Sequence, residues 1–391
     1  MKSNYSILGN YIRLVDARNT DRVIDKVLGI SIDKFFIPSV ANLIGTDLSK
    51  YKLITKGEFA CNPMHVGRDE RLPVALYEEN EPAIVSPAYF TFEIIDRSLL
   101  DDNYLMMWFR RQEFDRICWL HTDGSVRGGI TWEDICRLEL PVPSIIEQRK
   151  IVRSYKAITE RIAIKKQIND NLVVFGTASI QENVGKAALI NLTEAEMDRM
   201  SLPDDFEIQT IFEFCKETKS GATPSRSQKE YWVNGVIPWV KSGEVHNNIT
   251  LKTEEFITPL GVSESSTKLL PKDTVLMAMY GVTAGEVGYL AIEATTNQAI
   301  CGMICNSKEY AAYLYFSLIQ SQAEISRLSN GGAQDNLSKN FIDNIKIVVP
   351  PSEFIGKMNL AVLVEQMTLN AKEIELLEEL QATVLTQLSS C

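Results

Sequence analysis

Two long, proline-free helical stretches constrain this 391-residue chain more than any other feature. The first runs from Ser144 to Leu172 and the second from Ser352 to Leu388, so their starts lie 208 residues apart. Each follows a mixed α/β segment of roughly equal length that ends in a Pro-rich strand. A unit that occurs twice predicts a tandem repeat in which a globular part alternates with a helix.

Both stretches carry apolar residues at the spacing of a coiled coil. Steps of four and three residues give one seam in each helix: Ile151, Tyr155, Ile158, Ile162, Lys165, Asn169 and Leu172 in the first, and Leu363, Met367, Asn370, Ile374, Leu377, Gln381, Val384 and Leu388 in the second. Polar residues within a seam fix the register of a helix pair at some cost in stability. The repeat therefore predicts an antiparallel, pseudo-twofold pair. Packing of each stripe on its own globular part is the alternative.

Composition places the chain among globular proteins with room for two or three domains: 45% of the residues are hydrophobic and 23% charged. No run approaches the roughly 18 to 20 apolar residues of a membrane span, and no signal-type apolar segment follows the first residues. We therefore expect a cytoplasmic protein without membrane contact. Seven cysteines without a CxxC pair and three histidines argue against a disulfide framework or a metal centre.

The net charge of −11 by itself argues against a nucleic-acid partner, because phosphate contacts need Lys or Arg facing the duplex. Much of the acidity, however, lies in the last helix, whereas basic residues recur in the globular parts, for example at Arg110–Arg111. This distribution fits a scaffold that touches DNA through limited surfaces and proteins through others.

The two globular parts show the same order of predicted elements. The first has strands at 28–32, 52–54, 59–62 and 83–95 and a helix at 102–119; the second has strands at 274–280, 288–291 and 298–304 and a helix at 309–329. A polar, glycine-rich loop then follows in each, at 122–129 and 331–336. Glycine there allows close approach of the backbone to a ligand, and simple turn formation is the alternative.

Short motifs in both halves carry a family resemblance. In the second half they are Ser220–Ser227 (SGATPSRS), Tyr231–Trp232 and Ile237–Gly243 (IPWVKSG). In the first half they are Leu28–Lys34, Asn62–Arg68, Ser86–Tyr89, Ser125–Gly129 and the junction Leu140–Pro143 with Glu147–Gln148. These segments resemble the specificity (S) subunits of Type I restriction-modification enzymes. Two parts depart from the pattern: Ile355–Gly356 replaces the Glu-Gln pair at the second junction, and residues 173–200 match nothing in it.

The resemblance implies an α+β fold with two mixed α/β target-recognition domains in tandem, at residues 1–144 and 202–350. A spacer helix with a connector at 145–201 and a second spacer helix at 351–391 would form an antiparallel coiled coil with pseudo-twofold symmetry. Each recognition domain would read one half of a bipartite, asymmetric site in double-stranded DNA, and the helices would set the gap. Because the two globular parts share little sequence beyond their plan, the two half-sites should differ.

The same resemblance implies a non-catalytic subunit with several partners. Two adenine-N6 methyltransferase (M) subunits would dock on the helices, and restriction (R) subunits would complete the complex. We expect no cofactor on this chain, with S-adenosylmethionine, ATP and Mg²⁺ on the partner subunits. The alternative is a structural adaptor that binds proteins and reads no DNA; it predicts no salt-dependent association with duplex DNA.

Candidate DNA-binding residues come from the loops of both globular parts. Arg can grip guanine O6 and N7 with two hydrogen bonds, and Asn or Gln can do the same to adenine. The candidates are Lys34, His65, Arg68, Arg71, Ser125 and Arg127 in the first part, and Thr223, Ser225, Arg226, Lys241, Tyr280, Gln334, Asn336 and Lys339 in the second. For each loop Arg, a solvated charge or a surface ion pair is the alternative.

Intrinsic enzyme activity is disfavoured by what the motifs lack. Asn62-Pro63-Met64-His65 begins like the tetrad of amino-methyltransferases but lacks the second Pro and the aromatic residue. The glycines at 281, 285 and 288 have the wrong spacing for a dinucleotide site, and no GxxxxGK[ST] loop is present. The carboxylates near Asp204 lack the lysine of a metal-dependent nuclease, because Gln209 stands in its place.

Overall fold

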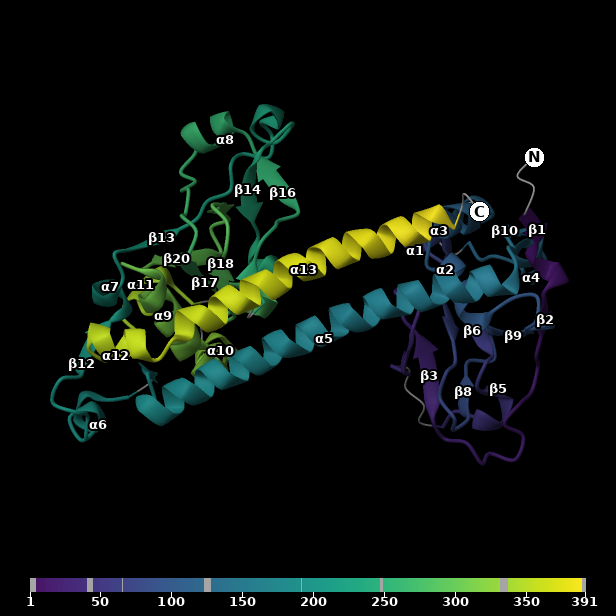
Figure 1. The fold of residues 1–391 in the computed structure, drawn as a ribbon, viewed down its shortest axis with the longest axis horizontal. Coiled ribbons are helices and arrows are strands. Elements are labelled where there is room, and N and C mark those ends of the chain that lie inside the picture. The colour runs from purple at the N-terminus through teal and green to yellow at the C-terminus, as the bar shows by residue number, and fades with distance from the viewer. Residues whose placement is uncertain are drawn as a thin grey trace. The chain divides into compact units, whose positions relative to one another are not determined.

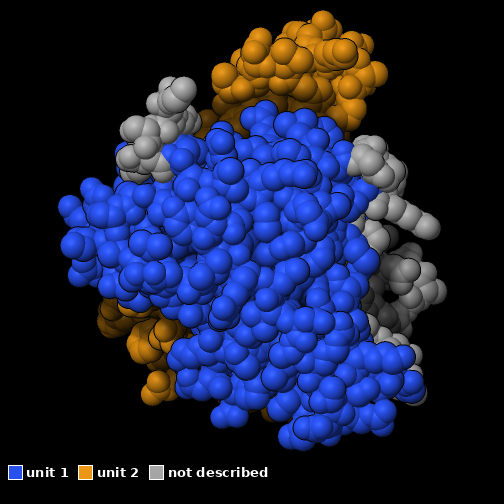
Figure 2. All heavy atoms as spheres, turned by 90° about the vertical axis from the view of Figure 1, so that its right-hand side faces the viewer, with its two compact units in different colours: residues 1–161, 377–391 blue, residues 162–376 orange. Residues whose placement is uncertain are grey.

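The computed structural model describes residues 5–40, 45–64, 66–122, 128–190, 192–246, 249–330 and 337–388. The fold is α+β, with two mixed α/β parts in tandem and long helices (Figure 1). The chain forms two compact units, coloured separately in Figure 2: unit 1 is Met1–Arg161 with Leu377–Cys391, and unit 2 is Ile162–Leu376. The division falls inside the long helices, so the domain boundaries expected from the sequence stay predictions.

Unit 1 contains two four-stranded sheets and one strand pair. The strands are β1 (Tyr5–Ile7), β2 (Ile12–Leu14), β3 (Val27–Ile30), β4 (Phe36–Pro38), β5 (Lys52–Ile54), β6 (Phe59–Cys61), β7 (Val74–Leu76), β8 (Ala83–Val85), β9 (Phe90–Ile94) and β10 (Glu139–Pro141). The sheet orders are β2-β9-β6-β7 and β4-β3-β8-β5, and β1 pairs with β10. The predicted strand at 83–95 is divided into β8 and β9 by a turn in which the Tyr89 N–H donates to the Ser86 carbonyl.

Aromatic side chains form much of the unit 1 core. The rings of Phe59 and Phe92 stack with centroids 5.1 Å apart, and Phe109 meets both rings edge-on. The helices of this unit's globular part are α1 (Val66–Asp69), α2 (Asp102–Phe109), α3 (Gln112–Leu120) and α4 (Trp132–Arg137). The helix predicted at 102–119 is therefore two helices, because Arg111 adopts an extended backbone conformation that lets α3 start in a new direction.

Unit 2 contains a five-stranded sheet and two three-stranded sheets. Their orders are β13-β20-β17-β18-β15, β16-β14-β19 and β11-β21-β12. The strands are β11 (Ala188–Leu189), β12 (Glu207–Thr210), β13 (Glu217–Ser220), β14 (Ile237–Val240), β15 (Ile249–Thr250), β16 (Glu255–Ile257), β17 (Thr274–Ala278), β18 (Val287–Leu290), β19 (Thr295–Thr296), β20 (Ile300–Ile304) and β21 (Lys346–Val349). The predicted strands at 274–280, 288–291 and 298–304 are confirmed as β17, β18 and β20.

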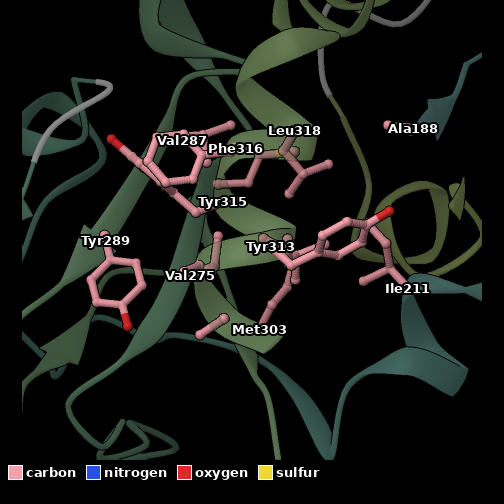
Figure 3. Close-up of a cluster of buried hydrophobic side chains, with 14 of the residues drawn as sticks. Ala188, Ile211, Val275, Val287, Tyr289, Met303, Tyr313, Tyr315, Phe316 and Leu318 are labelled. Carbon is pink, nitrogen blue, oxygen red and sulfur yellow. The ribbon is translucent and has the colours of Figure 1, made fainter. Parts of the chain in front are cut away.

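The core of unit 2 is built around α9 (Lys308–Gln320), whose residues 311–318 are all buried. Figure 3 shows Tyr313, Tyr315 and Phe316 from this helix among side chains of the five-stranded sheet. The other helices of this unit's globular part are α6 (Glu194–Met197), α7 (Ile211–Phe214), α8 (Pro259–Ser263), α10 (Gln322–Asn330) and α11 (Lys339–Asp343). The helix predicted at 309–329 is thus interrupted at Ser321, the C-cap of α9.

The two predicted seam helices are α5 (Ile145–Asn183), followed much later by α12 (Ser352–Lys357) and α13 (Leu360–Gln387). Helix α5 continues eleven residues past the predicted end at Leu172. The second predicted helix is broken at Asn359, whose φ of 53° belongs to the left-handed region that Asn tolerates better than most residues.

The two helices contact each other antiparallel, as their seams predict. In unit 1, Gln381 Nε2 donates to Thr159 Oγ1 at 2.8 Å. In unit 2, Lys165 pairs with Glu373 at 2.9 Å, and Asn169 accepts from Asn370 at 2.8 Å. As residue numbers rise along α5, the numbers of the contacting residues on α13 fall, so the two helices run antiparallel. Seam residues also enter the globular cores, so the pairing and the packing alternatives both occur; Tyr155 and Leu388 are examples in unit 1.

We predict opposite effects for two Gly→Ala substitutions in the helices. A Cβ at Gly176 of α5 would lie 2.3 Å from the Phe316 ring, so Gly176→Ala is expected to lower the free energy of unfolding by about 1–3 kcal/mol. At Gly356 of α12 nothing lies within 4 Å, so Gly356→Ala is expected to raise it by up to about 1 kcal/mol, the usual helix preference. Urea unfolding of the full chain measures both. Equal effects would contradict the close packing at Gly176.

Candidate nucleic-acid interface

Arg226 is the centre of an aromatic and charged surface on unit 2. Its guanidinium lies 3.6 Å from the centroid of the Trp232 ring and 5.0 Å from that of Trp239. Both indoles hold the backbone that carries Arg226, since Trp232 Nε1 donates to the Ser225 carbonyl and Trp239 Nε1 to the Ala222 carbonyl. This arrangement restricts the guanidinium to one place on the surface.

Carboxylates from the segment before and within β16 bind the two cations of this surface. Arg226 donates to Glu255, and Lys241 lies 2.6 Å from Glu254 and 3.5 Å from Glu255. The hydrogen bond from Arg226 lowers the pKa of Glu255, and the hydrogen bond with Glu254 raises the pKa of Lys241. Glu244 fixes the same region by accepting from the backbone N–H groups of Lys241 and Glu254. The cations are therefore held in position by acidic groups at an exposed site.

Three more predicted residues adjoin this surface. Thr223 donates to Gln298, and the Ser225 hydroxyl lies 2.8 Å from that of Ser227. Tyr280, which is 38% exposed, precedes the short η5 helix (Gly281–Thr283). The Thr283 hydroxyl donates to the carbonyl of Ser242, the neighbour of Lys241. The structure thus brings Thr223, Ser225, Arg226, Lys241 and Tyr280 into one region of unit 2.

Of the three remaining candidates of unit 2, Lys339 is described by the structure. Lys339 is half-buried and donates to the Thr218 hydroxyl at 2.6 Å and to Asp343, so its charge already joins α11 to β13. Gln334 and Asn336 lie outside the described residues. The described chain resumes at Leu337, whose N–H donates to the Met279 carbonyl, next to Tyr280.

In unit 1, Arg68 and Arg71 are both about half exposed, and each has a carboxylate partner. Arg68 binds Asp69 through two nitrogens, at 2.6 and 2.9 Å, and Arg71 lies 3.3 Å from Asp33. The Gly67 N–H donates to the Gly128 carbonyl, which connects this segment to the glycine-rich loop. His65, Ser125 and Arg127 lie outside the described residues, so their roles stay predictions.

Arg71 also borders a groove of unit 1 that sequence reasoning did not identify. The groove has a volume of about 1150 Å³ and is lined by α3, by the residues around Arg71 and by the end of α13. Arg110, Arg116 and Trp119 contribute exposed side chains to it. The adjacent pair Arg110–Arg111 was its only sequence signal, and of that pair Arg111 is buried beside Glu113.

Lys34 is wrong as a DNA-contacting candidate. Its side chain is buried, with the ammonium 2.7 Å from Asp115 and 4.8 Å from the Phe114 ring centroid, and it donates to the Phe109 carbonyl. Burial lowers the pKa of the ammonium, although Asp115 opposes this. With φ at 68°, Lys34 turns the chain after β3 and directs its side chain into the core. A sequence shows a turn and a charge here but not the buried partner 81 residues away.

Trp232, Trp239 and Glu255 are the site residues that the candidate set missed. The two tryptophans stand in the motifs quoted above, but the sequence alone does not show that both rings meet Arg226. Glu255 lies in none of the quoted motifs. Among the described residues, no group of three His, Cys, Asp or Glu side chains lies close enough together to hold a metal ion. The described helices include none with the length and apolarity needed to span a membrane.

Comparisons with known proteins find similarity to Type I specificity subunits over part of the chain. Residues 203–379 match the model of the Type I restriction modification DNA specificity domain. The chain is 25% identical over 218 residues to the specificity subunit of the Type I restriction enzyme EcoR124I/EcoR124II of Escherichia coli, a match covering 54% of this chain and 49% of that protein. It is 29% identical over 166 residues to the MjaIX specificity subunit of Methanocaldococcus jannaschii, covering 40% and 37%. Over these segments the chain is similar to specificity subunits of Type I restriction enzymes.

The fold comparison covers more of the chain than the sequence matches do. A crystal structure of the Type I restriction-modification S subunit from M. genitalium superposes with a TM-score of 0.55 over 98% of this chain and 95% of that one, at 18% identity. That likeness concerns the fold. The sequence matches span half or less of the curated relatives' length. The region matched by the specificity-domain model includes the whole Arg226 surface.

We predict that the buried pair beneath the unit 1 surface contributes strongly to stability. Asp115 accepts from the Lys34 ammonium and from the Leu72 N–H. Asp115→Ala leaves a buried ammonium without its partner and is expected to lower the free energy of unfolding by about 3–5 kcal/mol. Glu93→Gln, which breaks the exposed pair with Arg13, should cost at most about 1 kcal/mol. Similar losses in chemical denaturation of the two variants would contradict this assignment.

Proposed function

We propose that this chain is the DNA-reading subunit of a Type I restriction-modification complex and has no catalytic activity of its own. Each globular part would bind one half of a bipartite, asymmetric site in double-stranded DNA. The observation that carries the proposal is the Arg226 surface, which lies inside the region matched by the DNA specificity domain.

The chemistry of that surface suits recognition of a base pair. Stacking on Trp232 leaves the guanidinium planar and oriented, and a planar fork can donate two hydrogen bonds to guanine O6 and N7. Lys241, paired with Glu254 and Glu255, is a compact point charge suited to a phosphate. The carboxylates hold both cations in place before DNA arrives, and the exposed ion pairs exchange at small cost.

The exposed side chains of unit 1 support recognition of a different sequence. Arg68, Arg71, Arg110 and Arg116 offer guanidinium groups there, and Trp119 is the exposed aromatic residue among them. The described part of unit 1 has no arginine that contacts two tryptophan rings as Arg226 does in unit 2. Because the two surfaces present different side chains, we infer two unlike half-sites.

Exposed apolar residues on the long helices favour partner subunits. On α13, Val362, Leu369 and Leu376 recur at intervals of seven and are 57–66% exposed. On α5, Ile164, Ile168 and Phe175 are also exposed. These residues lie outside the seam and form a second apolar stripe on each helix, the pattern of a helix that packs against more than one neighbour. We propose that two adenine-N6 methyltransferase subunits cover them and that restriction subunits complete the complex.

In this assignment the chemistry belongs to the partners. S-adenosylmethionine would be bound by the methyltransferase subunits, and ATP and Mg²⁺ would also be held on partner subunits rather than by this chain. This chain would position the complex on DNA, and the lengths and register of its helices would set the gap between the half-sites.

The proposal is tested by co-expressing the chain with a cognate methyltransferase subunit in a host that lacks the modification. Single-molecule sequencing then maps N6-methyladenine. A split motif with two unlike halves and a constant gap supports DNA reading by both parts. No new modification, with a stable complex confirmed, supports the adaptor without DNA readout.

Replacement of Arg226 should affect one half-site only. We expect Arg226→Ala to weaken discrimination at a base pair of that half by about 1–3 kcal/mol, and Arg226→Lys to resemble it because Lys lacks the planar fork. The readout is the frequency of each base in the methylated motif. Arg13→Ala, at an exposed paired arginine of unit 1, is the control and should leave both halves unchanged. Relaxation of both halves by Arg226→Ala would contradict the assignment.

A further inference from the structure

A connected polar network interrupts the apolar seam between α5 and α13. Asn370, which is 1% exposed, donates to Asn169 Oδ1 at 2.8 Å, and Asn169 donates to the Met367 carbonyl at 3.2 Å. Asn370 Oδ1 accepts from Lys165 and from Gln366, each at 3.1 Å. Lys165 also pairs with Glu373 at 2.9 Å. All of these contacts lie within unit 2, and the Asn370 amide is satisfied as both donor and acceptor.

The repeat in the chain places this network at a special position. The two helical stretches are related by an offset of 208 residues, so position 165 in the first is equivalent to position 373 in the second. Lys165 therefore pairs with the residue at its own equivalent position, Glu373. In an antiparallel pair of equivalent helices, residues that pair with their own equivalents lie at the twofold axis. The Lys165–Glu373 pair is therefore an axial pair with opposite charges. By the same offset, Asn169 is equivalent to Leu377 and Asn370 is equivalent to Ile162. The asparagine pair is therefore matched by an apolar pair at the equivalent positions.

We propose that this network selects the pairing of α5 with α13 of the same chain over pairing between like helices of two chains, and that it locks their register. Such selection is needed because both helices have seams with the same spacing. The apolar residues alone therefore do not favour α5–α13 pairing over α5–α5 or α13–α13 pairing.

Pairing of like helices is disfavoured by charge and by desolvation. If α5 paired with α5 of a second copy, Lys165 would face Lys165, and Asn169 would face Ile162. If α13 paired with α13, Glu373 would face Glu373 and Asn370 would face Leu377. Like charges at the axis repel, and an amide buried against an aliphatic side chain loses its hydrogen bonds without replacement.

The register is restricted by the same residues. A slip of one heptad along α13 would place Leu363 or Leu377, instead of Asn370, opposite Asn169. The two amides would then lose their hydrogen bond to each other, and Lys165 would lose its ion pair with Glu373. A single buried polar contact is known to select register and partner number in coiled coils, at a cost in stability. This inference concerns assembly of the chain itself and does not depend on the proposed DNA-reading function.

The test uses two full-length copies with different affinity tags, expressed together. The apolar variant Lys165→Leu/Asn169→Ile/Asn370→Leu/Glu373→Leu removes the network. The charge-swapped variant Lys165→Glu/Glu373→Lys retains opposite charges at the axis. The matched control Gln167→Leu/Asn171→Leu/Lys372→Leu/Glu379→Leu adds four leucines at exposed positions of the same helices. Co-purification of the two tags, followed by sedimentation velocity, measures pairing between copies.

We expect about tenfold more mixed-tag species for the apolar variant than for the control, since a preference of about 1.4 kcal/mol corresponds to a factor of ten. The wild type and the charge-swapped variant should remain at the control level, and Lys165→Glu alone should lose stability that the swap restores. Equal amounts of mixed-tag species in the apolar variant and the control, whether discrete dimers or aggregates, would overturn the proposal. So would failure of the swap to restore what Lys165→Glu loses.

Discussion

Burial of the seam between α5 and α13 is the interaction on which the rest of the structure depends. Because α13 ends in unit 1, that unit is built from both ends of the described chain: Leu388 lies in the same core as Val152 and Tyr155. In unit 2 the beginning of α13 packs with α9, as Leu360 and Val364 belong to the core that contains Phe316. The helices are therefore part of both hydrophobic cores and not linkers added to finished domains.

The environment of each cation decides what it does, and Lys34 and Arg226 show the two extremes. Lys34 is enclosed by Asp115, Phe114 and a backbone carbonyl, so its charge contributes to folding and is unavailable to a ligand. Arg226 also has a carboxylate and aromatic neighbours, but it lies at the surface, where stacking orients the guanidinium without removing it from water. The difference is one of desolvation, since similar partners surround both groups.

Much of the plan was predictable because it depends on local patterns. The mixed α/β segments, the tandem order, the strands β3, β5, β17 and β20 and the antiparallel helix pair follow from periodicity and repetition. Breaks were harder to predict: Arg111, Ser321 and Asn359 interrupt predicted helices although none is Pro or Gly. At these positions tertiary packing redirects the chain against a modest local preference for helix. The motifs contain Arg226, Lys241 and both tryptophans, but they do not show that the two indoles meet Arg226.

The sequence by itself determined the repeat, the seams and the residue types available to each surface, because period and composition act over short distances along the chain. Only the tertiary structure decided which polar residues would meet. Asn169 and Asn370 are 201 residues apart and form a part-buried contact, and Lys34 and Asp115 are 81 apart and form a buried one. Such contacts arise when burial removes water from groups that then require each other. That requirement appears only once the apolar faces have brought distant segments together.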